Sequence, residues 1–188
     1  MFSEQVSTYR NLITLKDGAR VLLRLLTPDD RSRLIEMFAH ASPDDVKYLR
    51  DPVTDGEMVG RWVEQLDYSR VLPLVAVVQD RLVGDATLHF RKGPARHVGE
   101  VRIFLTKDFR RRGLGSQMLC AVIDLARKAG LHLLVAEVVA DQTKVIKAFR
   151  HAGFQIQCSF EDFFMFPDGE TGDVMMLTMR LIPREEEF

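Results

Sequence analysis

The chain has 188 residues, 46% of them apolar and 28% charged, and its formal net charge is −1. This length favours one domain whose core needs neither metal nor disulfides, and the near-neutral charge disfavours a nucleic-acid-binding protein. With two cysteines, no secretory signal and no apolar run of membrane-spanning length, we expect a cytoplasmic protein without a membrane partner.

The first half of the chain predicts a hairpin, two helices and three further strands. Residues 9–26 hold two β runs around the Lys-Asp-Gly turn signal at 16–18. Thr27 precedes Pro28 and two acids, as N-caps do, so a helix should begin there, and Asp55 can cap a second helix. The further strands expected are residues 72–80, 81–90 and 97–106, with residues 93–96 as a loop.

The second half alternates helices and strands. Apolar residues from Met118 onward recur at helical spacing, and Gly130 closes the helix that they predict over residues 113–130. After it we expect a buried strand at 131–139, a helix at 143–153, strands at 154–160 and 173–182, and a solvated tail at 184–188. This order predicts one α/β (α+β) domain over residues 1–188, with the N-terminal hairpin as a short extension.

The stretch FRRRGLGSQML at 109–119 combines arginines with glycines at a predicted strand–helix junction. A P-loop would need a lysine after its second glycine, and a dinucleotide fingerprint would need a third glycine where Met118 stands. The free N–H groups at a helix start favour negative charge, and glycine lets an anion approach the backbone. We therefore interpret the stretch as a pyrophosphate site; a plain glycine turn beside solvated arginines is the alternative.

The same stretch resembles a known family. Arg110-Arg111-Arg112-Gly113-Leu114-Gly115 matches the Arg/Gln-x-x-Gly-x-Gly/Ala signature of the GNAT superfamily of N-acetyltransferases, and residues 136–154 resemble the strand, helix and Gly-Phe that follow in that family. The element order is similar from roughly Ala19 to Leu181. The resemblance implies a GNAT-like mixed, mostly antiparallel central sheet flanked by helices, and acetyl-CoA as the co-substrate.

Two N-terminal segments resemble a subgroup of that family. Residues 13–30 and 41–50 are similar to the leucine-Asp-Gly hairpin and the Ser…Tyr-x-Arg element of bacterial protein-lysine acetyltransferases of the Pat type. This resemblance implies transfer of the acetyl group to a protein lysine by direct attack in a ternary complex. A small-molecule amine as acceptor, and a catalytically inactive acyl-CoA-binding regulatory module, are the alternatives.

Glu100 is the candidate catalytic base. It precedes the arginines on the predicted strand, where many members of the family carry an acid. A general base acts directly or through one water, here on a lysine amine whose reference pKa is about 10.4. The alternatives are a structural glutamate paired with Arg102, or His97 as the base.

The resemblance also implies which residues hold the coenzyme. Backbone groups near the end of the strand, splayed by a bulge in the family, would bind the pantetheine arm and polarise the thioester. The side chain of Phe104 is expected in the core. The cofactor-binding residues expected are Phe104, Leu105, Thr106, Arg110, Arg111, Arg112, Gly113, Leu114, Gly115, Ser116, Gln142 and Phe149.

Two positions depart from the family pattern. Many members carry Asn early in the short helix and Tyr four residues before the closing glycine, where this chain has Gln142 and Phe149. Phe149 cannot protonate the leaving thiolate, although a reference pKa of about 8.5 makes that thiolate a fair leaving group without an acid. The missing phenol keeps the inactive module open as an alternative.

The segment EDFFMF at 161–166 is a candidate acceptor rim. Its aromatic residues would form an apolar edge, and the acids Glu161 and Asp162 would attract a cationic lysine. Tyr48 and Arg50 would face the same groove. The alternative for EDFFMF is ordinary strand-end packing, and the alternative for Tyr48 and Arg50 is that they are plain surface loop residues.

Other candidate residues carry no chemistry in this interpretation. His89, His132 and His151 lack metal-ligand spacing with cysteines or acids, so we expect no metal. Cys120 lies in mid-helix without a neighbouring histidine, where small buried cysteines are common, and is not expected to be a nucleophile. The partners expected are acetyl-CoA and the acceptor, without nucleic acid or membrane, and a homodimer is left open.

Overall fold

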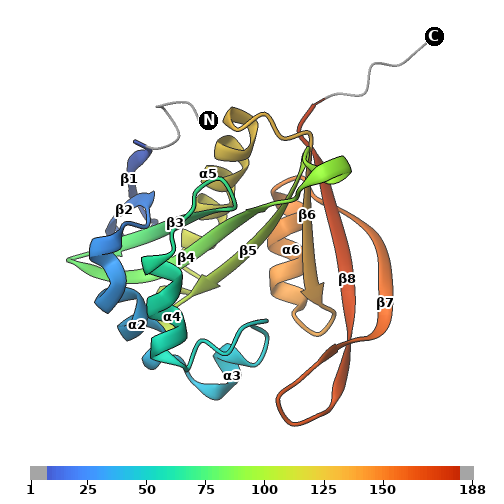
Figure 1. The fold of residues 1–188 in the computed structure, drawn as a ribbon, viewed down its shortest axis with the longest axis horizontal. Helices are drawn as coiled ribbons and strands as arrows, with labels where there is room; N and C mark the ends of the chain where they lie inside the picture. The colour runs from blue at the N-terminus through green and yellow to red at the C-terminus, as the bar shows by residue number, and fades with distance from the viewer. Residues whose placement is uncertain (1–7, 183–188) are drawn as a thin grey trace.

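One eight-stranded sheet forms the centre of the molecule (Figure 1). The structure is a computed structural model that describes residues 8–182. The strands follow the order β1-β2-β3-β4-β5-β6-β8-β7, and among these described strands only β5 and β6 are parallel neighbours. This confirms the mixed, mostly antiparallel sheet that the resemblance implied. The strand bounds are β1 Arg10–Thr14, β2 Arg20–Leu25, β3 Val71–Val78, β4 Arg81–Phe90, β5 Val98–Leu105, β6 Leu133–Val139, β7 Gln155–Met165 and β8 Thr171–Arg180.

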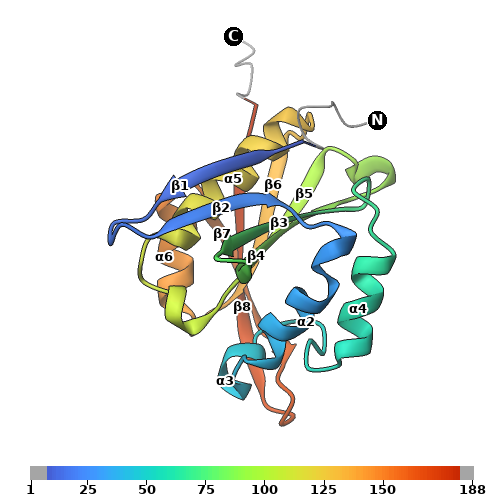
Figure 2. The same ribbon diagram turned by 90° about the vertical axis from the view of Figure 1, so that its left-hand side faces the viewer.

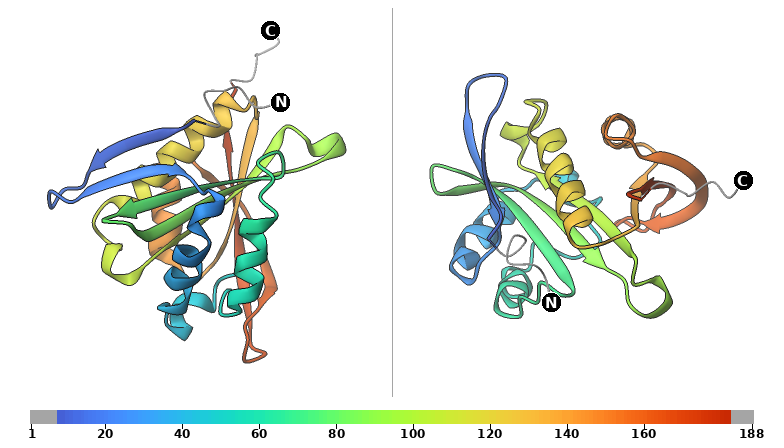
Figure 3. Two further views of the ribbon diagram at one scale, coloured as in Figure 1. Left: turned by 60° about the vertical axis from the view of Figure 1, so that its left-hand side comes forward. Right: turned by 90° about the horizontal axis from the view of Figure 1, so that it is seen from above.

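Helices cover both faces of this sheet. The helices α2 and α4 lie on one face, and α5 and α6 lie on the other (Figures 2 and 3). The helix bounds are α2 Arg31–Ala39, α3 Pro43–Val46, α4 Gly56–Glu64, α5 Leu114–Lys128 and α6 Thr143–His151, with 3-10 turns η1 Pro28–Asp30, η2 Gly93–Ala95 and η3 Lys107–Phe109.

Each face of the sheet has its own apolar core. Under α5 and α6 the predicted helical stripe is confirmed, because Met118 and Ala126 are 0% exposed and Val122 is 1% exposed. Under α2 and α4 the rings of Phe38 and Phe104 pack with their centroids 5.1 Å apart. The side chain of Phe104 therefore lies in the core, as expected.

A buried carboxylate fixes the start of the first long helix. The chain turns helical after Thr27, as predicted, with η1 leading into α2. Asp30 is 0% exposed and accepts hydrogen bonds from Arg24 at 2.6 and 2.7 Å and from the Thr27 N–H at 2.9 Å. Burial alone would raise the pKa of Asp30, but the bonds from Arg24 and Thr27 outweigh it and lower the pKa to about 2. This carboxylate ties β2 to the helix start.

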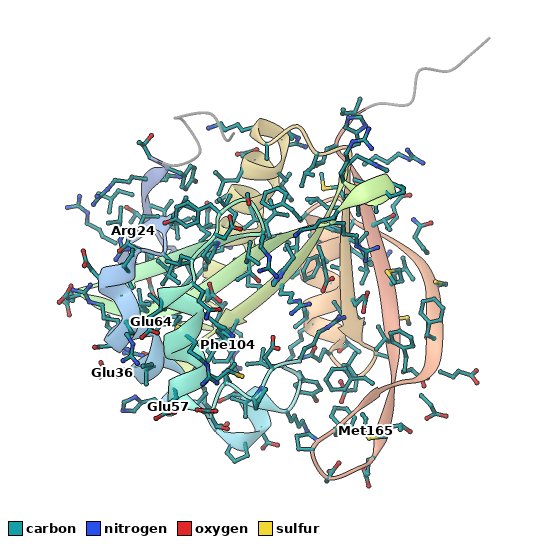
Figure 4. The ribbon with its side chains drawn as sticks, viewed as in Figure 1. Arg24, Glu36, Glu57, Glu64, Phe104 and Met165 are labelled. Atoms are coloured by element: carbon teal, nitrogen blue, oxygen red, sulfur yellow. The ribbon has the colours of Figure 1, made fainter. Side chains whose placement is uncertain are left out.

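The last hairpin differs from the prediction. The pattern predicts a strand over residues 154–160, whereas β7 continues into EDFFMF and ends at Met165, which Figure 4 labels. Every residue of β7 except Phe164 is exposed, and Met165 is 71% exposed. The pairing of β7 with β8 shifts register twice, once after Ile156 and once after Phe160. The predicted loop at 93–96 contains η2, and the expected tail at 184–188 lies outside the described residues.

Candidate active site

Strands β5 and β6 separate in the middle of the sheet. They pair over three positions, of which the last is Glu100↔Val135, while β5 continues against β4 to Leu105. Figure 1 shows the two strands diverging. The β4–β5 register runs without a shift along its described length, so this ladder lacks the bulge that the resemblance implied. Beyond Glu100, the β6-facing edge of β5 has no strand partner among the described residues, and the Leu105 carbonyl on this edge accepts a hydrogen bond from Arg110 Nε at 2.9 Å.

This edge of β5 offers backbone groups to an extended ligand. The Thr106 N–H donates to the Val83 carbonyl at 3.1 Å, which is toward β4. Because backbone groups alternate sides along a strand, those of residues 104 and 106 face β4, and those of residues 103 and 105 face the opening. Of the three residues expected to hold the pantetheine arm, Leu105 has its backbone on the open edge.

The loop before α5 presents free N–H groups. Gly113 has φ +87, a left-handed conformation that favours glycine, and a Cβ added there would meet nothing within 4 Å. The first helical hydrogen bond runs from the Gln117 N–H to the Gly113 carbonyl at 3.2 Å, so the N–H groups of residues 113–116 lie ahead of the helical ladder. Open space, free donors and the positive end of the helix dipole all fit a pyrophosphate group.

The three arginines beside this loop have different partners. Arg110 pairs with Asp45, which lies in α3, and Arg112 pairs with Asp17 in the β1–β2 turn. Arg111 is exposed, and no described residue bonds to its side chain. Arg110 and Arg112 therefore hold the loop in place, and Arg111 is the cation left available to an anion.

Four other expected cofactor residues lie in the helices α5 and α6 or at the start of α6. Leu114 and Phe149 are buried, at 0% and 2% exposure, so their side chains belong to the core. Gln142 is the N-cap residue of α6, and Ser116 is exposed in the first turn of α5. Their contacts with a coenzyme stay predictions.

Glu100 lies in a cluster of charges. Its Oε1 accepts a hydrogen bond from Arg102 Nε at 2.8 Å and lies 3.5 Å from an Arg50 nitrogen. Arg50 also pairs with Glu137 of β6, so it bridges the two strands where they separate. Burial alone would raise the pKa of Glu100, but the hydrogen bond and charge of Arg102, helped by the charge of Arg50, lower it. Glu100 is thus ionised at neutral pH. The ion pair between Glu100 and Arg102, on which the alternative of a structural glutamate depends, is present.

A cavity of about 350 Å³ adjoins this cluster, between the sheet and the helices α2 and α4. Asp85, Thr87 and His89 of β4 line it from the sheet side. The Oδ1 atom of Asp85 is closed off from solvent and accepts no hydrogen bond from any described residue. Burial raises the pKa of Asp85 to about 7. Burial, with the charge of Arg102, lowers the pKa of His89 to about 4.

Sequence reasoning missed two acids of this face, Asp85 and Glu137. Both have the same sequence signal, which is a single acid inside an apolar strand, in LVGDATL and LLVAEVV. A charge at such a position needs a partner or a ligand. Glu137 has the partner Arg50, whereas Asp85 has none among the described residues.

Tyr48 brings the segment after α3 against the β7–β8 hairpin. Its ring meets the Phe166 ring edge-on with the centroids 5.8 Å apart. Glu161 and Asp162 are exposed on β7, and Asp162 accepts a hydrogen bond from β8. The rim hypothesis therefore has Tyr48 and Phe166 in contact, while Arg50 turns toward Glu100.

The remaining candidates of the sequence lie apart from this region. His97 is exposed and its ring centroid lies 5.7 Å from that of His132. Within residues 8–182, no three His, Cys, Asp or Glu side chains gather as metal ligands do. Cys120 is an exposed thiol, so its expected burial is wrong: this position of α5 faces solvent.

No helix in the described part of the chain is long and apolar enough to cross a bilayer.

Comparison with known proteins begins with a local match. The L-methionine sulfoximine/L-methionine sulfone acetyltransferase of Pseudomonas aeruginosa is 39% identical over 57 residues, which are 30% of this chain and 33% of that protein. The chain thus matches about a third of the length of this curated relative.

Solved structures extend the likeness to the whole fold. The GNAT domain of S. lividans PAT has a TM-score of 0.78 and 22% identity, covering 96% of this chain and 99% of that domain. YncA of Salmonella typhimurium, solved with its cofactor acetyl-CoA, has a TM-score of 0.75 and 20% identity, covering 88% of this chain and 96% of that one. Residues 20–155 match the family model described as the acetyltransferase (GNAT) domain. Since that match covers most of the chain, the protein belongs to the GNAT acetyltransferase family, whose members use acetyl-CoA.

Proposed function

We propose that this protein is an acetyl-CoA-dependent N-acetyltransferase that acetylates a primary amine by direct attack in a ternary complex. The observation that carries the proposal is the separation of β5 from β6 beside Glu100, which leads to the free N–H groups before α5. An ionised carboxylate stands at one end of this path and an anion site at the other. Acyl transfer from coenzyme A to an amine needs both.

Different residues of the chain bind the coenzyme, accept the proton and stabilise the developing charge in the proposed reaction. The N–H groups of residues 113–116 and the side chain of Arg111 hold the pyrophosphate, and the open edge of β5 holds the arm. The thioester supplies the acetyl group and a thiolate that leaves readily. Glu100 takes the amine proton, directly or through one water, and backbone N–H groups on the open edge of β5 stabilise the charge that develops on the carbonyl oxygen.

A protein lysine is the first acceptor that we propose. The half-buried rings of Tyr48 and Phe166 meet, and the exposed acids Glu161 and Asp162 lie on β7, the strand that leads to Phe166, so a peptide could lie along this rim. The GNAT domain of S. lividans PAT has a similar fold over nearly its whole length.

A small-molecule amine is the second candidate acceptor. The cavity beside Arg102 favours it, because pockets of this size are typical of small-ligand sites. The Pseudomonas aeruginosa relative is named for a small acceptor.

Incubation with acetyl-CoA and a cell extract, divided into proteins and metabolites, tests the proposal. Mass spectrometry that finds new acetyl groups on proteins supports a lysine acceptor, and new acetyl groups on metabolites support a small amine. A protein that binds acetyl-CoA and acetylates neither fraction would be the inactive binding module.

A glycine variant tests the coenzyme site separately. Gly113→Val places a branched side chain where the pyrophosphate would approach, so calorimetry should show acetyl-CoA affinity lower by at least about tenfold, the loss of one or two charge-assisted bonds. Gly169→Val is the matched control, because Gly169 has φ +90 and open space but lies in the β7–β8 turn. Equal affinity in both variants would remove Gly113 from the coenzyme site.

A further inference from the structure

The cavity under α2 and α4 begins at the charges around Glu100 and runs along β4. In the antiparallel register His89 stands opposite Glu100, Thr87 opposite Arg102 and Asp85 opposite Phe104. Directly opposed residues share a face of the sheet, so Asp85 and Glu100 lie on the same face. Phe104 is four residues beyond Glu100, which places Asp85 about 13 Å along the strands from the candidate base.

Asp85 is a carboxyl group of this cavity that has no partner among the described residues. Its Oδ1 is inaccessible to solvent, and none of the described side chains or backbone groups donates to it. A buried carboxyl oxygen without a donor costs free energy, and folded proteins keep few of them. Asp85 as a whole is half-buried and lines the cavity, so its second carboxyl oxygen is the one that a ligand can reach, and no described group donates to that oxygen either.

The other charged groups that line the cavity do not supply that donor. They are Arg50, Asp51, Asp67, Arg70, His89 and Arg102. Arg50 is held by Glu100 and Glu137, and Arg102 is held by Glu100 and lies 3.6 Å from Asp51. No ion pair joins any described cation to Asp85. Asp85 thus lines this cavity without a counter-charge from any described residue.

We propose that this cavity is the acceptor site and that Asp85 binds a second cationic amine of a small diamine substrate, whose first amine is the one acetylated. The inference rests on the proposed function with its second candidate acceptor, a small-molecule amine, and names the class of that amine. An ammonium group at the accessible oxygen of Asp85 provides both a hydrogen-bond donor and the missing counter-charge. A lysine of a protein has one side-chain ammonium, which would go to the reaction centre and leave Asp85 open.

Matched probes with and without the second amine test this. The probes are α,ω-diamines of four to eight carbons and the linear monoamines of the same lengths. The wild-type protein should acetylate its best diamine with a kcat/KM at least about tenfold above that of the matching monoamine, because a charge-assisted hydrogen bond is worth about that factor. Asp85→Asn should lose this preference, mainly through a raised KM for the diamine.

Two comparisons keep the outcome clear. Asp124→Asn makes the same change on the exposed side of α5, across the sheet, and should keep the diamine preference. The best diamine should also raise the melting temperature of the wild-type protein more than the monoamine does, and Asp85→Asn should abolish that difference.

The possible failures can be told apart. A diamine preference that Asp85→Asn leaves intact overturns the role of Asp85 while the acetyltransferase proposal stands. Acetylation of proteins with refusal of every diamine overturns the inference in favour of a lysine acceptor. If no amine of any kind is acetylated, the proposed function fails, and the melting temperatures still decide whether Asp85 binds an ammonium group.

Discussion

Asp30 and Asp85 both carry carboxyl oxygens that solvent cannot reach, and their surroundings are opposite. Asp30 accepts hydrogen bonds from Arg24, Thr27 and Arg33, and its pKa falls to about 2. Asp85 borders a cavity with one oxygen that no described group meets, and burial raises its pKa to about 7. A carboxylate that secures the fold is surrounded by donors from its own chain, whereas one that serves a ligand keeps a position open.

Glu100 differs from both Asp30 and Asp85, because it is paired like Asp30 and yet is proposed to act chemically. Glu100→Gln should lower kcat by about 10²–10⁴-fold near neutral pH, since the amide cannot accept a proton. Activity should recover partly as the pH approaches the amine pKa of about 10.4. Steady-state rates over that pH range are the measurement.

The neighbouring acid Glu137 provides the control for Glu100. Glu137→Gln makes the same substitution at the other carboxylate bound by Arg50 and should lower kcat much less. If the Glu100 variant keeps the wild-type rate across the pH range, then Glu100 is structural and pairing alone explains its position.

Asp30→Asn tests the structural side of the comparison. Removing the charge leaves Arg24 without its partner in a largely buried place, so urea unfolding at pH 7 should show a stability lower by about 3 kcal/mol. The contribution of Asp30 is present above its unfolded pKa near 3.8 and is lost as the pH falls through about 2, so the two proteins should converge there. Asp29→Asn, on an exposed neighbour, should change stability by less than about 0.5 kcal/mol.

Asp85→Asn should have the opposite effect on stability. The folded pKa of Asp85 is raised from 3.8 to about 7, so the folded protein favours its protonated form. The contribution of Asp85 to the free energy of unfolding of the wild-type protein is therefore fully present below the unfolded pKa of 3.8. This contribution is lost as the pH rises through about 7. The asparagine variant should therefore be more stable by about 2 to 4 kcal/mol at pH 8 and by much less at pH 4. Equal stabilities at pH 8 would mean that Asp85 has a partner in solution.

Charge reversal at the rim should have the smallest effect. Glu161→Lys with Asp162→Lys should raise KM for a lysine peptide by up to about fivefold, as exposed charges contribute up to about 1 kcal/mol. Acetyl-CoA affinity should stay the same. Asp124→Lys is the control on the opposite face. An unchanged peptide KM would return EDFFMF to ordinary strand packing and favour the cavity as the acceptor site.

The sequence predicted most of the fold because its signals are local. The apolar stripe from Met118, the turn before Ala19 and the cap at Thr27 each depend on neighbours along the chain, and each is confirmed. The predicted end of β7 at residue 160 was wrong, because an exposed strand has no apolar alternation that marks where it ends. Exposure on both faces is a tertiary outcome that local pattern does not contain.

The site was predicted less well because its partners are distant in sequence. The glycine–arginine stretch identified the anion loop, but nothing local shows that Arg110 binds Asp45 or that Arg112 binds Asp17, which are 65 and 95 residues away. Whether Asp85 has a hydrogen-bond donor or a counter-charge depends on the side chains that distant segments of the chain place beside it. Such information appears only when the sheet register is known.

The exposed strand β7 has a consequence for the behaviour of the protein in solution. An outer strand with a row of free backbone groups and large apolar side chains is a template on which a second chain can add by edge-to-edge pairing. The two register shifts against β8 and the positive φ of Asp162 bend this strand and interrupt that row. These irregularities therefore oppose aggregation by edge-to-edge pairing of β7 with the β7 strand of a second molecule. A redesigned β7 without the register shifts should aggregate more readily.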